Sequence, residues 1–237
     1  MIAAVIPVLN EAGAIGPTVR SLPRDVLDLV VVVDGDSGDG TVAEARAAGA
    51  EVLVERRCGY GQACASGAAL AAERGAAIVV FMDGDGADAP EAIGSIVAPI
   101  IDGSADFVIA SRTRGVREPG SMGWHQIVAG QLVGAAVGAL SGVRYTDMCA
   151  LRALRVETLA GLRMREMGYG WNLEMQMRAA LNGLRVREIP VPYRNRIAGV
   201  SKVAGNFRGT LRAGSRIVRV LARVAVEARR ERSTLAG

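Results

Sequence analysis

Two aspartates that follow an apolar strand are the residues of this sequence best suited to chemistry. The run Val79-Val80-Phe81-Met82 has the pattern of a buried strand, and Asp83, Gly84 and Asp85 follow it directly. Carboxylates one residue apart at a strand end can bind one hard divalent cation, such as Mg²⁺ or Mn²⁺, which completes its oxygen ligands from a diphosphate. The alternative is a solvated acidic turn that binds nothing.

A second polar loop follows the apolar run Leu29–Val33 and leads into a helical pattern. Asp39 or Thr41 in this loop is suited to cap the helix, because a side-chain oxygen there accepts a hydrogen bond from a free backbone N–H. Capping leaves Asp34 and Asp36 unexplained. Their carboxylates can accept hydrogen bonds from a nucleobase N–H or a ribose hydroxyl, so this loop is a candidate nucleotide contact.

The elements that must position these loops alternate regularly. Short runs rich in Val and Ile are each followed by a loop and an alanine-rich helical pattern, which predicts an α/β fold with a mostly parallel central sheet flanked by helices. In such a sheet a ligand lies at the carboxyl ends of the strands. A third loop with Pro7, Asn10 and Glu11 falls there too, although alone it has the pattern of a turn before a capped helix. The expected strands are Ile2–Val8, Leu29–Val33, Glu51–Val54, Ala77–Met82, Asp106–Ala110 and Leu184–Ile189, and the expected helices are Ala12–Leu22, Thr41–Ala48, Gln62–Arg74, Pro90–Ile101, Gln126–Leu140 and Leu173–Asn182.

The composition bounds the class of protein. The chain has 237 residues, of which 50% are hydrophobic and 22% charged, so it has enough apolar material for one compact core and is not a disordered chain. Cys58, Cys64 and Cys149 show no CxxC spacing, which predicts reduced thiols in a cytoplasmic protein and argues against a zinc site. With His125 as the single histidine, a Ser/His/Asp hydrolase or a multi-histidine metal site has little to build on.

No segment of the sequence predicts export or a membrane span. Met1 leads into an apolar run without a basic n-region or a cleavage site, so no secretory leader is expected. The longest apolar stretch, Ile127–Val143, is interrupted by Gln131 and is rich in Gly and Ala. It is shorter than the roughly 20 apolar residues that a spanning helix needs. We expect a buried helix there.

The C-terminal region is basic and the rest of the chain is acidic. Residues 200–237 carry nine basic and two acidic side chains. We expect one domain over 1–205 and a basic amphipathic helix and tail over 206–237. The helix is suited to an anionic membrane surface, to packing on the body of the protein, or to an oligomer interface. No nucleic-acid partner is expected, because only 4% of the residues are aromatic and stacking platforms for bases are lacking. The arginines that share one face of this helix are Arg208, Arg212, Arg216, Arg219 and Arg223.

The three loops together resemble those of the family 2 glycosyltransferases of the GT-A nucleotide-diphospho-sugar transferase fold. The hallmarks of that family are a PxxNE-like first loop, a DDGSxDGT-like second loop and a DxD third loop. Further segments are similar to the branch that contains dolichyl-phosphate mannosyl- and glucosyltransferases, and the likeness extends from Ile2 to Gly214. These segments are Gly59-Tyr60-Gly61-Gln62-Ala63, Ala110-Ser111-Arg112, Tyr145-Thr146-Asp147, the run from Gly168 to Met175, and Tyr193-Arg194-Asn195-Arg196 followed by Gly199-Val200-Ser201-Lys202.

The resemblance implies an inverting, metal-dependent transferase that moves a sugar from a nucleotide-diphosphate sugar, of the UDP-glucose or GDP-mannose type, to a polyprenyl or dolichyl phosphate. It implies that Asp83 and Asp85 hold Mg²⁺ or Mn²⁺. The catalytic candidates are Asp85, Asp88, Arg112 and Glu174. Donor contacts are expected from Pro7, Asn10, Glu11, Asp34, Asp36, Gly61, Asp83 and Gly84. Acceptor or phosphate contacts are expected from Arg117, Asp147, Arg194, Arg196, Ser201 and Lys202.

The chain also departs from the family pattern. Gly35 stands where relatives carry the second carboxylate of the second loop, with Asp36 one place later. Ala87 stands where a Gln often follows the DxD pair, with Asp88 beside it. The run Met148–Ala153 replaces a GFRA-like segment on the acceptor side. The resemblance therefore specifies the reaction class more closely than the acceptor.

Several alternatives stay open at this point. An ionised phosphate acceptor needs positioning more than a general base, whereas a soluble or glycolipid hydroxyl acceptor needs a base, for which Asp88, Asp147 and Glu174 are candidates. Asp147 can equally be a structural cap and Glu174 an ordinary helix position. A non-catalytic membrane-surface protein on the same fold is a third alternative. For the lipid-acceptor hypothesis we expect a cytoplasmic protein, peripheral on the cytoplasmic membrane face, that can form a homo-oligomer.

Overall fold

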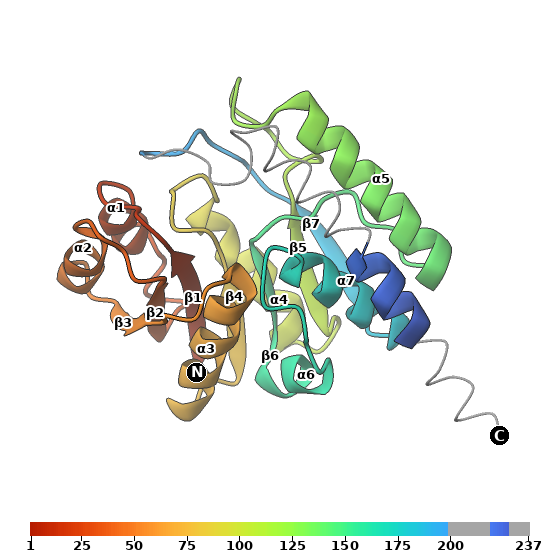
Figure 1. Cartoon of the computed structure of the whole chain (residues 1–237), viewed down its shortest axis with the longest axis horizontal. Helices are drawn as coiled ribbons and strands as arrows, with labels where there is room; N and C mark the ends of the chain where they lie inside the picture. Colours follow the sequence, from red (N-terminus) through yellow and green to blue (C-terminus); the bar gives the residue numbers. More distant parts are fainter. Residues whose placement is uncertain (199–218, 228–237) are drawn as a thin grey trace.

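A computed structural model describes residues 1–198 and 219–227, and in it one sheet is flanked by helices (Figure 1). The strands are β1 (Ile2–Val8), β2 (Leu29–Asp34), β3 (Glu51–Val54), β4 (Ile78–Phe81), β5 (Phe107–Ser111), β6 (Arg152–Arg155) and β7 (Val186–Pro190). The helices are α1 (Ile15–Arg20), α2 (Thr41–Ala47), α3 (Tyr60–Glu73), α4 (Ile93–Ile101), α5 (Trp124–Ser141), α6 (Val156–Gly161) and α7 (Trp171–Leu181), and a 3₁₀ turn, η1 (Pro90–Ala92), precedes α4.

The sheet confirms the predicted fold class. Its seven strands follow the order β3-β2-β1-β4-β6-β5-β7. Strands β1 to β4 pair in parallel, as do β5 and β7, whereas β6 runs antiparallel between β4 and β5. The expected elements are present with ends shifted by a few residues, but β6 and α6 were not expected. The segment of β6, Arg-Ala-Leu-Arg, has arginines where an apolar run would signal a strand.

Helices α3 and α7 cover the same face of the sheet. In α3, Gly67 lies against the side chains of Val5 and Val33, so close that a Cβ there would stand 2.5 Å from a Val5 methyl. In α7, the Trp171 ring packs edge-on against Phe81 with 6.4 Å between ring centroids. Val5 and Phe81 are partners in register across β1 and β4, so they point to the same face. The glycine lets α3 approach the strands closely enough to close this part of the core.

Helix α5 is not the buried helix that its sequence predicts. Its inner side is buried at Val133 and Val137, but Val128 is 44% exposed and Leu132 is 67% exposed. The helix packs against α7. Among the described residues, no helix is both long enough and apolar enough to cross a membrane.

The described part of the predicted C-terminal helix, residues 219–227, is helical and packs on the body of the protein beside α7 (Figure 1). Val220 and Val224 are each 2% exposed and belong to the hydrophobic core. Glu227 accepts a hydrogen bond from Arg178 of α7 at 2.6 Å. For these residues, packing on the body is the alternative that holds. The rest of the predicted helix and the boundary between 205 and 206 lie outside the described residues.

The close approach at Gly67 yields a stability prediction. Gly67→Ala should lower the free energy of unfolding by about 1–3 kcal/mol, because the stiff side chains of Val5 and Val33 must move to admit a methyl group. Gly94→Ala in α4 is the matched control, since a Cβ there has nothing within 4 Å. It should raise the free energy of unfolding by about 0.5–1 kcal/mol, because alanine favours helix. Urea unfolding at equilibrium measures both, and equal effects would contradict the packing argument.

Candidate active site

Loops at the carboxyl ends of β1, β2, β3, β4 and β5 surround a cavity of about 1030 Å³. Its other wall comes from the start of α5 and from residues 148–150, 167–173 and 193–196. The volume is at the upper end of the range for ligand sites. The cavity therefore lies at the edge of the sheet where an α/β fold binds its ligand.

Asn10 ties the first loop to the second. Its N–H donates to the Ser37 hydroxyl oxygen at 2.8 Å, and its side-chain oxygen accepts a hydrogen bond from the Gly38 N–H at 3.0 Å. Asn10 has a φ of +50°, a left-handed conformation that Asn adopts more readily than most residues. Asn10 thus shapes the loop, while its neighbours Pro7 and Glu11 line the cavity.

Asp34 holds the second loop together and does not line the cavity. It is 1% exposed, and its two carboxylate oxygens accept hydrogen bonds from the Ser37 N–H at 2.8 Å and the Ser37 hydroxyl at 2.5 Å. The next residue, Gly35, lines the cavity in its place. Asp36 is exposed and lies 3.7 Å from Arg56. The structure thus gives Asp34 a structural role and places Asp36 outside the cavity wall.

Three aspartates are gathered at the end of β4. Asp83 and Asp85 line the cavity, and Asp88 lies behind them, 3% exposed, with its carboxylate accepting a hydrogen bond from the Asp83 N–H at 3.0 Å. Burial, and then the charges of Asp88 and Asp85, raise the pKa of Asp83 well above its usual range. Burial also raises the pKa of Asp88, and the charge of Asp85 adds to this effect. The raised values mean that the surrounding protein under-compensates this negative charge.

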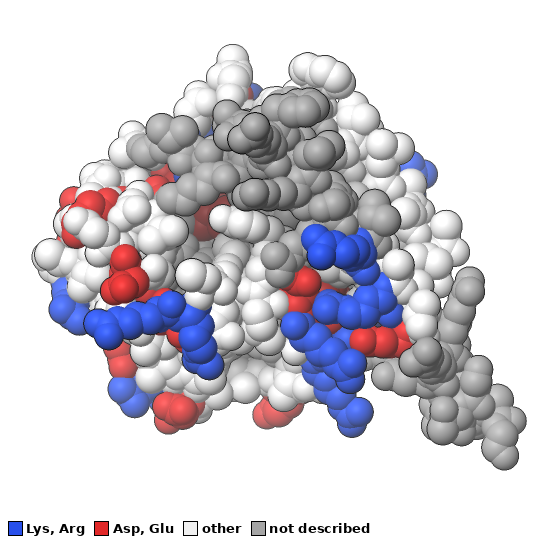
Figure 2. Space-filling view, in the orientation of Figure 1, with Lys and Arg blue, Asp and Glu red and all other residues white. Residues whose placement is uncertain are grey.

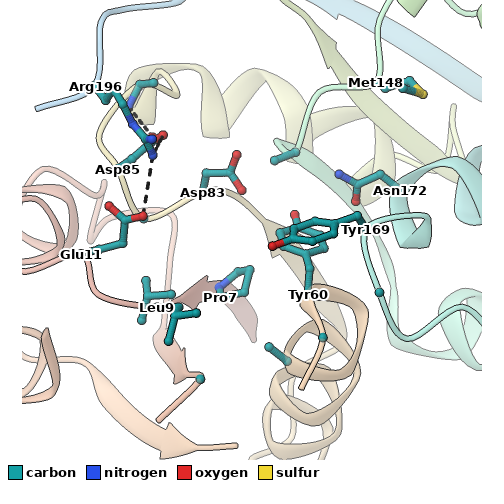
Figure 3. Close-up of a pocket in the computed structure, with 18 of the residues that line it drawn as sticks. Pro7, Leu9, Glu11, Tyr60, Asp83, Asp85, Met148, Tyr169, Asn172 and Arg196 are labelled. Atoms are coloured by element: carbon teal, nitrogen blue, oxygen red, sulfur yellow. Dashed lines mark hydrogen bonds and ion pairs between the residues drawn. The ribbon is translucent and has the colours of Figure 1, made fainter. Parts of the chain in front are cut away.

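Arg196 lies beside this acidic group (Figure 3), on a segment that is bonded to the same loop, since the Ile197 N–H donates to the Asp85 carbonyl oxygen at 2.9 Å. Its Nη2 lies 2.7 Å from Asp85 Oδ2 and 3.7 Å from Glu11 Oε1. Figure 3 shows Asp83 beside them, pointing toward the open space that Asn172 faces from the other side. The guanidinium therefore stands where a positive charge beside Asp85 is needed.

Arg152 is a buried positive charge that the sequence did not single out. It lies in β6, is 0% exposed, and donates hydrogen bonds to the carbonyl oxygens of Ala150, Asn172 and Cys149. These partners are neutral, so they leave the charge of Arg152 uncompensated. That charge acts on Asp83, whose pKa it lowers against the larger effect of burial. A lone arginine in an unexpected strand gives no sequence signal for this role.

Arg112 is held rigidly at the cavity wall by Asp147. The Arg112 Nε and Nη2 donate to the two carboxylate oxygens of Asp147 at 2.9 and 2.8 Å, and the Arg112 N–H donates as well at 2.8 Å. The ring of Tyr193 lies 4.9 Å from the guanidinium carbon. Asp147 is 2% exposed and does not line the cavity, so in this structure it positions Arg112 rather than facing a ligand.

Glu174 is buried away from the cavity. Its carboxylate accepts hydrogen bonds from the Arg165 and Glu166 N–H groups at 2.9 and 2.5 Å, and from Arg178 at 3.0 Å and Arg223 at 3.2 Å. These bonds join α7 to the preceding loop and to the helical segment 219–227. A general base must reach its substrate, and the structure does not place Glu174 for that role.

The structure brings together part of the predicted set. The predicted residues that line the cavity are Pro7, Glu11, Asp83, Gly84, Asp85, Arg112, Arg194 and Arg196. Those that do not are Asn10, Asp34, Asp36, Gly61, Asp88, Arg117, Asp147 and Glu174. Ser201 and Lys202 lie outside the described residues.

Glu55 and Arg57 line the cavity although the sequence did not single them out. The Arg57 side chain donates to both oxygens of Glu55, at 2.9 and 2.6 Å, and Ser66 donates as well. The hydrogen bonds from Arg57 and then Ser66 lower the pKa of Glu55 to about 2. A signal was present, because both residues follow the carboxyl end of β3, as the predicted loops follow β1, β2 and β4.

The donor set suits a divalent cation bound together with a diphosphate. Asp83 and Asp85 offer carboxylate oxygens to the cavity, and burial, followed by the charges of Asp88 and Asp85, raises the pKa of Asp83. Within residues 1–198 and 219–227, no three His, Cys, Asp or Glu side chains form a ready ligand set. That pattern fits Mg²⁺ chemistry, in which one or two carboxylates and substrate phosphates share the ion.

The sequence is similar to proteins of known family. A family model described as "Glycosyl transferase family 2" matches residues 3–157. The chain is 33% identical over 221 residues to the undecaprenyl-phosphate mannosyltransferase of Micrococcus luteus, an alignment that covers 86% of this chain and 88% of that protein. It is 33% identical over 228 residues to the dolichyl-phosphate hexose transferase of Haloferax volcanii, covering 92% and 93% of the two chains.

Solved structures share the fold. The crystal structure of glucosyl-3-phosphoglycerate synthase from Mycobacterium tuberculosis with Mg²⁺ and uridine diphosphate matches with a TM-score of 0.75 at 21% identity, over 95% of this chain and 79% of that one. The same enzyme with Mn²⁺, uridine diphosphate and glucosyl-3-phosphoglycerate matches with a TM-score of 0.74 at 22% identity, over 95% and 80%. These likenesses confirm the GT-A fold that the loop motifs predict.

The Arg112–Asp147 pair yields a prediction on stability and its pH dependence. Burial opposes ionisation of Asp147, but the hydrogen bonds and charge of Arg112 outweigh it and lower the pKa of Asp147. Asp147→Asn should reduce the free energy of unfolding by about 3 kcal/mol near pH 7, because a largely buried arginine loses its partner. A lowered pKa means that this stabilisation is present above the unfolded-state value of about 3.9 and is lost as the pH falls through the folded-state value.

Denaturation of both proteins between pH 8 and pH 3 measures this dependence. The difference between wild type and Asp147→Asn should be constant from pH 8 to pH 5 and should shrink only below about pH 4. A difference that vanished already at neutral pH would show that the ion pair is not what stabilises this wall.

Proposed function

The chain belongs to glycosyl transferase family 2, and from that membership we propose that it transfers a sugar from a nucleoside-diphosphate sugar to a polyprenyl or dolichyl phosphate. The observation that carries this proposal is that carboxylates and arginines line one cavity. Asp83 and Asp85 offer carboxylate oxygens to it, and Arg112, Arg194 and Arg196 offer guanidinium groups. A cation held by the carboxylates can bind the donor diphosphate, and the arginines can bind the acceptor phosphate.

Two relatives support the lipid-phosphate acceptor. The proteins from Micrococcus luteus and Haloferax volcanii are named for undecaprenyl phosphate and dolichyl phosphate, and each aligns over more than four fifths of this chain. The donor can be of the UDP-glucose or the GDP-mannose type. The solved structures with uridine diphosphate share the fold, and on that ground UDP-glucose is the first donor to test.

The residues fit a transfer with inversion at the sugar carbon. An oxygen of the acceptor phosphate forms a bond to the anomeric carbon while the bond from that carbon to the diphosphate breaks, and the electron pair leaves with the nucleoside diphosphate. A phosphate oxygen is already ionised near neutral pH, so the reaction needs orientation more than a base. Arg112, fixed by Asp147, offers the forked geometry that binds phosphate oxygens in two places.

A divalent cation, Mg²⁺ or Mn²⁺, would be held by Asp83 and Asp85. Bound there, it supplies Lewis-acid stabilisation to the leaving diphosphate. Arg196, which is paired with Asp85 at 2.7 Å and lies 3.7 Å from Glu11, would offer its guanidinium to a phosphate oxygen at the same place.

The proposal predicts a large effect of Asp85→Asn. Purified protein is supplied with UDP-glucose or GDP-mannose, Mg²⁺ or Mn²⁺, and a short-chain prenyl phosphate, and the sugar–phosphate product is measured by mass spectrometry. Wild type should form product with one donor only in the presence of metal. Asp85→Asn should lower kcat/KM by about 10³-fold, because several kcal/mol of charge stabilisation is lost.

Asp102→Asn is the matched control, because Asp102 is exposed at the end of α4, away from the cavity, and carries the same change of charge. It should leave kcat/KM unchanged. Transfer that is insensitive to Asp85→Asn, or transfer to a hydroxyl acceptor in preference to every prenyl phosphate, would overturn the proposal.

A further inference from the structure

Helix α5 exposes an apolar stripe along its whole length. Trp124, Val128, Leu132, Ala135 and Ala139 are all exposed, and their spacing of four, four, three and four residues places them on one helical face. Trp124 is 76% exposed and Leu132 is 67% exposed. At 1.5 Å per residue the stripe is about 22 Å long. We call these five residues the α5 stripe.

The stripe is a fixed surface, because the opposite side of α5 is anchored in the body. Val133 and Val137 are buried in the hydrophobic core. Gly134 lies against the carbonyl of Tyr145 so closely that a Cβ at that position would stand 1.9 Å from the oxygen. The exposed residues are therefore held outward by packing on the other side.

The helix itself carries no strongly charged side chain. No residue of α5 is Asp, Glu, Lys or Arg, and the part of its surface that Figure 2 shows, at the upper right beside the grey residues, is mostly white. In the sequence, the exposed Arg114 precedes the helix by ten residues, with the exposed Glu118 between them, and the exposed Arg144 follows it by three residues. An uncharged apolar surface of this kind suits the acyl chains at the surface of a bilayer.

The stripe is also continuous with the active-site cavity. Gly123 and Gln126, which flank Trp124 at the first turn of α5, line the cavity. Trp124 thus stands at the cavity end of the stripe, and tryptophan is a side chain that favours the level of the headgroups. A lipid phosphate that enters the cavity here can keep its apolar chain along the stripe.

We propose that the α5 stripe lies on the lipid bilayer and presents the cavity mouth to a membrane-embedded phosphate acceptor. This inference rests on the proposed function for its acceptor. For the basic C-terminal helix, the sequence left a membrane contact open beside packing on the body and an oligomer interface. In the described part of that helix, Val220 and Val224 are buried, and Arg223 points inward and contacts Glu174 at 3.2 Å. Those residues are engaged with the body of the protein.

The chain contains two tryptophans, which makes a direct test possible. Trp124 is exposed and Trp171 is 2% exposed, so a change of emission on adding vesicles reports on the stripe. With vesicles of phosphatidylcholine and phosphatidylglycerol, wild-type emission should shift to shorter wavelength and the protein should float with the lipid. Trp124→Phe should abolish the shift and still float.

Leu132→Glu places a charge in the middle of the stripe and should reduce flotation about tenfold or more, because a carboxylate replaces a leucine side chain that the bilayer would bury. Ile101→Glu is the control, since Ile101 is 56% exposed at the end of α4. It should float like wild type. Circular dichroism confirms that both variants are folded.

The two proposals can fail separately. Transfer to a short-chain prenyl phosphate in solution tests the proposed function, and Leu132→Glu should leave that rate unchanged while lowering transfer to a long-chain acceptor in vesicles about tenfold, in step with binding. Wild type that transfers in solution but neither floats nor shifts overturns the membrane surface alone. Sedimentation velocity distinguishes the remaining case, because a wild-type dimer that Leu132→Glu dissociates without a loss of flotation would assign the stripe to a second copy of the chain and overturn the proposal.

Discussion

The gathering of three aspartates at one strand end, with Asp85 and Asp88 buried and Asp83 half-buried, is the constraint on which the rest of this site depends. Charged carboxylates that are buried together are costly unless positive charge reaches them. The fold meets that need with arginines from segments distant in the sequence, namely Arg152 in β6, which pairs with the end of β4, and Arg196, which lies next to Asp85. Burial and the charges of Asp88 and Asp85 nevertheless keep the pKa of Asp83 raised, because the arginines do not cancel these effects.

The same logic explains why so many polar side chains around the cavity are engaged with one another. Asp34 holds Ser37, Asp147 holds Arg112, and Glu174 holds the loop before α7. A side chain that must meet a phosphate in one geometry is useful only when its own rotamer is fixed. The charged and polar residues around the site therefore form two groups. A few face the cavity, and a larger number hold those few side chains in place.

Sequence reasoning recovered the strands and the loops that follow them, because continuous apolar runs are a direct consequence of a sheet covered on both faces. It did not predict β6, because this strand begins and ends with arginine, Arg152 and Arg155, and no apolar run marks it. It also could not separate Glu11, which lines the cavity, from Asp34, which does not. Both carboxylates follow strands, and only the three-dimensional course of the loop decides which one turns inward.

Helix α5 shows a different limit of the sequence. Its residues are mostly apolar, and a mostly apolar helix is expected to be buried. That expectation rests on the transfer of apolar side chains out of water. Composition alone does not say whether protein or lipid replaces the water around them. Val137 is buried in the core and Leu132 is exposed. One face of this helix therefore packs on protein, and the other does not. An acceptor that is apolar along its chain and charged at its phosphate needs that combination beside a polar cavity, and a helix that contains no Asp, Glu, Lys or Arg provides it.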